Sequence, residues 1–212
     1  MTDLATQIQQ FNIELATQVP QEVLEAFGKS IEDLKTKNIE EKSIKIGETM
    51  PNFSLKNVKN EVVNSSDILK NGKMIIAFYR GSWCPYCNLE LKALQEKTAE
   101  FKKKNATLIA ISPQSPDNSL TVIEKHHLTF EVLTDKGNIF AKQLGITFEL
   151  QDFVLPYYHA LGIDLSSFNK TDDNSLPIPA VFVVDESSKI IYKFADVNYM
   201  NRIDIDELLK TL

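Results

Sequence analysis

Residues 78–91 read Phe-Tyr-Arg-Gly-Ser-Trp-Cys-Pro-Tyr-Cys-Asn-Leu-Glu-Leu and contain both cysteines of the chain, Cys84 and Cys87. The apolar run at residues 74–79 predicts a buried strand before the pair, and the pattern after the pair predicts a helix. Pro85 is favoured at the first position of such a helix. The stretch therefore predicts a strand, a turn and a helix, with Cys84 at the helix N-cap and Cys87 in the first turn.

Two thiols with this spacing at a strand-to-helix junction are typical of a thioredoxin-like redox site. The free N–H groups of the first helical turn and the helix dipole stabilise an anion there. A thiol in that position has a lowered pKa, and its thiolate is the reactive species. Because the second thiol is close, it can capture whatever forms on the first. We therefore expect Cys84 and Cys87 to be catalytic.

Two other interpretations of the pair are weaker. A zinc site needs four ligands, and only His126, His127 and His159 are available to supplement the cysteines, at spacings unlike those of a ligand knuckle. Buried structural cysteines pack as small hydrophobes, but Pro85 argues for a helix start instead. The sequence thus favours redox chemistry that requires no metal and no organic cofactor.

The composition is that of an ordinary globular protein, with 212 residues, of which 43% are hydrophobic and 25% charged. The net charge of −6 argues against nucleic acid or an anionic membrane as the main partner. We recognise no signal peptide, because the first basic residue is Lys29, and no apolar run approaches the ~20 residues of a membrane span. We expect a cytoplasmic protein in a reducing compartment, where a close cysteine pair is more often catalytic than structural.

Helices and strands alternate along the chain. Apolar residues at helical spacing predict an N-terminal helical hairpin within residues 1–38, which packs on the main domain or forms a homodimer contact; we favour packing. Residues 39–47 are polar and predict a linker to a domain over residues 47–212. Within this domain we expect a hairpin at 53–63, strands at 73–79, 107–111, 130–133, 180–184 and 190–194, and helices beginning near Pro85, Asp117, Asn138 and Asp204.

This order predicts an α/β fold with a central mixed sheet flanked by helices. Residues 146–178 fit the pattern poorly. Insertions of that length in a compact domain are often functional, so we expect them to shape a substrate pocket or an interface.

Three segments resemble the peroxiredoxin-like branch of the thioredoxin superfamily, the alkyl hydroperoxide reductase/thiol-specific antioxidant family. They are Gly-Glu-Thr-Met-Pro-Asn-Phe-Ser-Leu at 47–55, the cysteine stretch at 78–91, and Ile-Pro-Ala-Val-Phe-Val-Val-Asp at 178–185; the tail at 196–202 is also similar. The resemblance covers residues 47–212 and implies a thioredoxin-like fold and thiol redox chemistry. It also implies that Pro179 follows a cis peptide bond beside the cysteines, and that Arg202 supports the site.

The sequence departs from the peroxiredoxin motif at one position. In that motif a proline is followed, after three residues, by a threonine or serine and, after two more, by the cysteine that attacks peroxide. Laid without gaps, Arg80, Cys84 and Cys87 occupy these three positions, and Glu90 matches a glutamate that often follows. A thiol therefore stands where the family has the hydroxyl that orients peroxide. Cys-Pro-Tyr-Cys is also the glutaredoxin motif, which suggests glutathione or glutaredoxin as a reductant.

The leading hypothesis is a thiol-dependent peroxidase that reduces hydroperoxides. One cysteine attacks the peroxide and becomes a sulfenic acid, and the other condenses with it to a disulfide. A thioredoxin- or glutaredoxin-like dithiol then resets the pair by exchange. The alternatives are a thiol–disulfide oxidoreductase acting on protein disulfides and a redox-sensing binding protein.

Neighbouring residues are expected to assist the pair. Arg80 lowers a thiolate pKa or holds peroxide, unless it forms a surface salt bridge. Trp83 and Tyr86 cover the site and form a docking rim. Cys84, at the N-cap, is expected to face solvent and to form the mixed disulfide with the reductant, whereas the ungapped alignment slightly favours Cys87 as the thiol that attacks peroxide.

Overall fold

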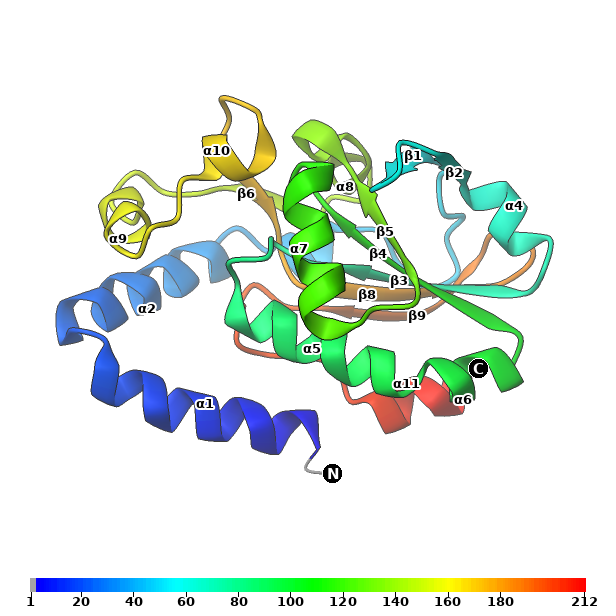
Figure 1. The fold of residues 1–212 in the computed structure, drawn as a ribbon, viewed down its shortest axis with the longest axis horizontal. Coiled ribbons are helices and arrows are strands. Elements are labelled where there is room, and N and C mark those ends of the chain that lie inside the picture. Colours follow the sequence, from blue (N-terminus) through cyan, green and yellow to red (C-terminus); the bar gives the residue numbers. More distant parts are fainter. Residues whose placement is uncertain (1–2) are drawn as a thin grey trace.

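The computed structural model describes residues 3–212 and has a mixed sheet of seven strands at its centre (Figure 1). The strand order is β2-β1-β5-β4-β3-β8-β9. The central strands β3, β4 and β5 are parallel, whereas β8 runs antiparallel to β3. The strands are β1 (Ser54–Asn57), β2 (Val62–Asn64), β3 (Lys73–Phe78), β4 (Ala106–Ser112), β5 (Glu131–Thr134), β8 (Ala180–Val184) and β9 (Ile190–Ala195). The expected mixed sheet flanked by helices is confirmed.

Helices cover both faces of the sheet. The side chains of a strand point alternately to the two faces, so each central strand contributes to a core on either side. Ile75 and Ala77 of β3 pack in one cluster with residues of the helices α5 (Pro85–Glu96), α6 (Thr98–Lys103) and α11 (Ile205–Thr211). α7 (Pro116–His126) joins this layer next to α5. Ile76 and Phe78 belong to a second cluster, with residues from α3 (Ile39–Lys42), α4 (Ser65–Leu69) and α8 (Ile139–Gln143), the last preceded by the 3-10 turn η1 (Lys136–Asn138).

The predicted N-terminal helices are present as α1 (Leu4–Gln18) and α2 (Gln21–Lys35). Asp3 caps α1 by accepting a hydrogen bond from the backbone of Thr6. The two helices meet at an angle near Pro20; α1 then runs along α5, and α2 runs beneath the segment that carries α9 (Figure 1).

Residues 39–47 do more than link two parts of the chain. Asn38 adopts a left-handed conformation with φ 50°, which ends the preceding helical turns and lets α3 begin at once. Ile39 is buried in the same core cluster as Phe78. The expectation of a plain polar linker is therefore wrong, because one apolar side chain anchors this segment to the sheet.

The segment at residues 146–178 forms a small layer of its own. It contains the antiparallel pair β6 (Thr147–Glu149) and β7 (Ser175–Pro177), and the short helices α9 (Leu155–Ala160) and α10 (Leu165–Asn169). Leu150, Val154, Tyr158, Leu165 and Leu176 form its buried centre.

The predicted cis bond before Pro179 is absent, since every peptide bond among residues 3–212 is trans. Ile178 donates its backbone N–H to Ile146 at 2.8 Å, and the carbonyl of Pro179 accepts from Asp196 at 3.2 Å. Pro179 thus bridges β7 and β8 in the ordinary isomer for a proline, which needs no tight turn here.

No helix within residues 3–212 has both the length and the apolar character needed to cross a membrane.

Candidate active site

Cys84 and Cys87 lie where the sheet leads into α5. Cys84 is the N-cap of the helix, with extended backbone angles (φ −88°, ψ 108°), and Pro85 occupies the first helical position. The backbone N–H of Cys87 donates to the sulfur of Cys84 at 3.4 Å, in the way a capping oxygen would accept it. Both cysteines are free thiols. The predicted placement at the helix start is confirmed.

Both thiols are buried, with 1% of Cys84 and 0% of Cys87 exposed. The expectation that Cys84 faces solvent is therefore wrong. An N-cap is exposed only if nothing packs over the helix end, and here apolar residues from the N-terminal helix and the C-terminal tail cover it: Ile8, Phe11, Tyr199 and Met200.

Arg202 supplies a positive charge to both sulfurs. Its Nη2 donates to Cys87 Sγ at 3.4 Å and to Cys84 Sγ at 4.0 Å. Its Nη1 donates to the carbonyls of Tyr199 and Asn201, which fixes the guanidinium in place. The side chain is 1% exposed, so water screens this charge very little. The structure thus brings the tail arginine to the thiols.

Glu90 completes a buried chain of charges. It lies three residues after Cys87 on α5, hence on the same helix face, and its carboxylate pairs with Arg202 Nε at 3.1 Å. Burial raises the pKa of Glu90 to about 7, because it opposes the charged form more than Arg202 favours it. The carboxyl therefore changes protonation near neutral pH, one helical turn from a thiol.

Arg80 lies two residues after the end of β3 and is 3% exposed. It donates to the hydroxyl of Tyr158 and stacks on three rings, with centroids 4.9 Å away for Trp83, 5.8 Å for Tyr158 and 4.7 Å for Tyr199. No carboxylate within residues 3–212 pairs with it, and its Nε has no hydrogen-bond partner there. The alternative of a surface salt bridge is therefore wrong.

The two thiols have very different affinities for a proton. Burial opposes the Cys84 thiolate, but the hydrogen bond from Cys87 and the charges of Arg80 and Arg202 outweigh it and lower the pKa of Cys84 to about 6. Burial, the hydrogen bond to Cys84 and the negative charge of that thiolate raise the pKa of Cys87. At neutral pH one thiolate therefore forms, and it is Cys84.

Trp83 and Tyr86 flank the pair but differ in their surroundings. Trp83 is half-buried and packs edge-on against Tyr158 at 5.5 Å. Tyr86 is buried beneath α1, with Phe11 in an edge contact at 5.1 Å and its hydroxyl bonded to Asn12 at 2.6 Å. The covering role expected for both is consistent with this geometry, whereas a docking rim at Tyr86 is not, because α1 occupies that surface.

A buried glutamine holds the loop that carries the cysteines. Gln114 accepts a hydrogen bond from the backbone N–H of Ser82 at 2.8 Å and donates to Tyr79 at 3.0 Å and Ser119 at 3.2 Å. This network ties the end of β3 to α7. Sequence reasoning missed Gln114, because nothing in its local pattern marks a residue whose partners lie 32 and 35 positions away.

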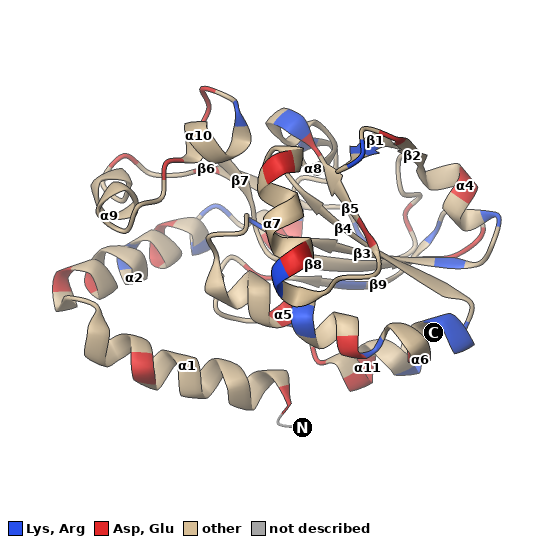
Figure 2. Ribbon diagram, viewed as in Figure 1, with Lys and Arg blue, Asp and Glu red and all other residues tan. Residues whose placement is uncertain are grey.

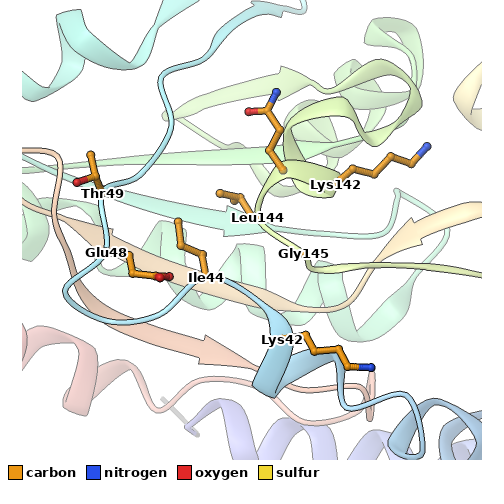
Figure 3. A pocket seen from close by; sticks show the side chains of 8 residues that line it. Lys42, Ile44, Glu48, Thr49, Lys142, Leu144 and Gly145 are labelled. Atoms are coloured by element: carbon orange, nitrogen blue, oxygen red, sulfur yellow. The ribbon is translucent and has the colours of Figure 1, made fainter.

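Other parts of the described chain offer no competing centre. Among residues 3–212 no three His, Cys, Asp or Glu side chains lie together as a metal site. An open pocket of about 550 Å³ lies by α8 and contains neither cysteine (Figure 3); it is lined by Lys42, Ile44, Glu48, Thr49, Lys142, Gln143, Leu144 and Gly145. A closed cavity of about 10 Å³ lies beside Arg80 and Pro179. The thiols and their two arginines are thus the chemically distinctive site.

Several known proteins are similar to this chain in sequence and in fold. The model of the AhpC/TSA family matches residues 46–193. The Peroxiredoxin Bcp of Escherichia coli (strain K12) is 26% identical over 162 residues, 76% of this chain and 92% of that protein. A putative peroxiredoxin bcp of Buchnera aphidicola is 32% identical over 104 residues, 49% of this chain and 65% of that protein. Thiol-disulfide oxidoreductase ResA of Bacillus thuringiensis is 21% identical over 173 residues, 81% of each chain.

Solved structures confirm the fold. The crystal structure of Peroxidoxin BcpB from Mycobacterium tuberculosis superposes with a TM-score of 0.62 at 19% identity, covering 79% of this chain and 96% of that one. The expected peroxiredoxin-like oxidoreductase of the thioredoxin superfamily is confirmed by these matches. Since the family model covers most of its length, the chain belongs to the AhpC/TSA family.

Proposed function

We propose that the protein is a thiol-dependent peroxidase that reduces hydroperoxides through Cys84 and Cys87. The observation that carries the proposal is the environment of Cys84, a thiol of pKa about 6 at a helix N-cap. It lies near two buried guanidinium groups and beside a second thiol that donates to it. The relatives named peroxiredoxin, which match most of the chain, support the same chemistry.

The proposed reaction has two steps. The Cys84 thiolate attacks one peroxide oxygen, the O–O bond breaks, and the other oxygen leaves as an alcohol or water after taking a proton; Cys84 becomes a sulfenic acid. Cys87 then attacks the sulfur of that sulfenic acid. An S–S bond forms, the S–O bond breaks, and the hydroxyl leaves as water with the proton of Cys87. The peroxide is reduced by two electrons, and the two thiols are oxidised to one disulfide.

The assignment of Cys84 as the attacking thiol rests on charge. The ungapped family alignment favours Cys87, but the thiolate is the nucleophile, and the proton leaves Cys84 first. Arg202 also donates to Cys87. Once the Cys84 charge is consumed in the sulfenic acid, the same guanidinium is free to stabilise the Cys87 thiolate for the second step.

We further propose that a thioredoxin- or glutaredoxin-like dithiol in the cytoplasm resets the disulfide. Such a dithiol attacks one sulfur, forms a mixed disulfide and is itself oxidised as the pair is reduced. Residues 47–212 carry this chemistry in the proposal, while α1 and α2 cover it. A second candidate function, thiol–disulfide exchange with protein substrates, is favoured by the match to ResA.

The decisive experiment is a steady-state peroxide assay coupled to a thioredoxin or glutaredoxin system. We expect peroxide-dependent turnover by the wild type, together with a loss of two hydrogens from the intact protein after one equivalent of peroxide. Cys84→Ser is expected to abolish turnover, while Cys87→Ser gives a protein that gains one oxygen. Reduction of insulin without peroxide turnover would instead establish the second candidate.

A further inference from the structure

The N-terminal helices close the redox site from one side. We propose that residues 4–27, which we call the cover, lie closed over the dithiol and open when the pair becomes a disulfide, so that a reducing protein reaches the sulfurs only in the open form. This inference rests on the proposed redox function of the pair. It adds a conformational step by which small peroxides reach the sulfurs in the closed form and a protein reductant reaches them only in the open form.

The cover seals the site through a few aromatic contacts. Phe11 and Asn12 of α1 hold Tyr86, and Phe27 of α2 meets Tyr158 at 5.7 Å and Tyr199 at 6.3 Å, both edge-on. With these contacts in place, at most 1% of either cysteine is exposed. The reacting O–O group of a hydroperoxide is small, so it needs only a narrow opening to reach a sulfur. A protein dithiol must bring its own sulfur and backbone into contact, so the closed cover excludes it.

The attachment of the cover is weaker than that of the rest of α2. No ion pair joins residues 4–27 to other parts of the described chain, and α1 carries a single charged residue, Glu14 (Figure 2). The cover has buried Leu4 and Val23, whereas the rest of α2 adds to its buried Ile31 and Leu34 the hydrogen bonds of Gln151 with Ser30 and Asp33. Gly28 separates the two parts within α2, where glycine costs a helix about 1 kcal/mol relative to alanine.

The buried charge of Arg80 couples the position of the cover to the oxidation state of the cysteines. Its guanidinium is buried with no carboxylate partner in the described chain, whereas Arg202 has Glu90. Burial opposes the charge of Arg80, and among its neighbours Tyr158 raises the pKa of Arg80 most and Cys84 next. Because burial raises the pKa of Tyr158, its hydroxyl is neutral at neutral pH, and the anion that faces Arg80 is the Cys84 thiolate, whose own pKa is lowered in return. A disulfide is neutral, so oxidation removes that anion and leaves a buried charge uncompensated, which is costly.

Opening the cover relieves this cost. Phe27 packs on two of the rings that enclose Arg80, Tyr158 and Tyr199. When Phe27 leaves, water reaches the guanidinium and its unpaired Nε. The same motion uncovers Tyr86 and the cysteines, so the state that needs a reductant is also the state that admits one.

Hydrogen exchange of the full-length protein in its dithiol and disulfide forms tests the proposal. The disulfide is made with diamide, which removes two hydrogens without any peroxide, and is verified by intact mass. We expect the backbone amides of residues 4–27 to exchange about tenfold faster in the disulfide form, while β3 and β4 stay unchanged. Equal exchange in the two verified forms overturns the proposal, even where the peroxide assay succeeds; failure of diamide to form the disulfide overturns it together with the redox role.

Two arginine variants test the cause. Arg80→Met removes the buried charge and is expected to leave the cover equally protected in both forms. Arg80→Lys keeps a charge and is expected to preserve the difference. A difference that persists in Arg80→Met would show that the charge does not drive the opening.

A pair of α1 variants tests access. Phe11→Ala weakens the contact with Tyr86, and Ile13→Ala, on the same helix at a residue that is 65% exposed, is the matched control. In the dithiol form, where the cover is closed, we expect Phe11→Ala to raise the rate of thiol oxidation by a protein disulfide about tenfold, with little effect on oxidation by diamide. Equal acceleration with both oxidants, or none, contradicts a cover that selects by size.

Discussion

Arg202 donates from Nη2 to the sulfur of Cys87 at 3.4 Å while its Nε faces the carboxylate of Glu90 at 3.1 Å. One guanidinium thus connects a thiol to Glu90, the only buried carboxylate within residues 3–212 that forms an ion pair with a lysine or arginine. Because all three groups are excluded from water, a change in the charge of one acts strongly on the others.

Removal of the Arg202 charge should weaken the nucleophile. We expect Arg202→Met to raise the pKa of Cys84 by about one unit and so to slow oxidation by peroxide about twofold at pH 7 and about tenfold at pH 5. Arg202→Lys keeps the positive charge but not the several donors of the guanidinium. We expect its Cys84 pKa and its oxidation rate to lie between those of the wild type and Arg202→Met. The thiolate absorbance in the ultraviolet, followed as a function of pH, measures the shift. An unchanged titration in Arg202→Met would remove Arg202 from the mechanism.

The rate of oxidation should follow the ionisation of Cys84. Its pKa of about 6 lies below the ordinary value for a thiol, so the thiolate is present above that pH and is lost below it. We expect the second-order rate constant with peroxide to fall about tenfold per pH unit below 6 and to level off above 7. Stopped-flow measurement on the Cys87→Ser variant isolates this step. Loss of peroxide oxidation in this variant would point to Cys87 as the nucleophile, and a rate that continues to rise up to pH 9 would show that Cys84 ionises like an ordinary thiol.

Glu90 should make the stability of the fold depend on pH. Its pKa rises from an ordinary value of 4.5 to about 7 on folding, so the folded state holds a proton that the unfolded chain releases. The stability that this proton contributes is present below pH 4.5 and is lost as the pH rises to about 7. Relative to Glu90→Gln, the free energy of unfolding of the wild type should fall by up to about 1.4 kcal/mol per pH unit in that window. Urea denaturation at several pH values checks this, and parallel curves for the two proteins would contradict it.

Gln114 should position the loop before the cysteines. Gln114→Ala removes the side-chain acceptor of the Ser82 N–H and leaves the Tyr79 hydroxyl with Ser119 alone, and we expect a loss of about 1–3 kcal/mol in the free energy of unfolding. Gln143→Ala, at an exposed position at the end of α8, is the control and should change little. Both are read by chemical denaturation, and equal stability of the two variants would show that the network is dispensable.

A covalent trap should show which sulfur faces the reductant. Cys84 lies at the N-terminal end of the helix and Cys87 inside its first turn. After one equivalent of peroxide, we expect the Cys84 sulfenic acid of Cys87→Ser to condense with a thiol of the partner, releasing water and forming a mixed disulfide. Non-reducing electrophoresis with a thioredoxin whose second cysteine is replaced reveals the adduct. Trapping by Cys84→Ser alone would reverse the assignment.

The sequence predicted best what depends on neighbours along the chain. Cys84, Pro85 and the apolar strand before them define the helix start locally, and the structure agrees. Continuous apolar runs, such as residues 74–79, likewise predicted strands of the sheet. Arg202, 118 positions from Cys84, was expected only through the resemblance of the tail to a known family.

What was missed depends on packing between distant segments. Phe11 and Phe27 look in the sequence like ordinary apolar positions of two amphipathic helices, and nothing local shows that they meet Tyr86, Tyr158 and Tyr199. The solvent-facing Cys84 and the exposed Tyr86 were wrong for this reason. Pro179 was expected to be cis from the family resemblance, whereas its backbone partners hold an ordinary extended connection between two strands.

The position of Trp83 has a practical consequence. It is the only tryptophan of the chain, it precedes Cys84 directly, and its ring stacks on Arg80 and meets Tyr158. Excited indole is quenched by nearby sulfur and responds to the polarity around it. The tryptophan emission of the protein therefore comes from one indole that adjoins the reacting atoms, so turnover can be followed optically in real time without any label.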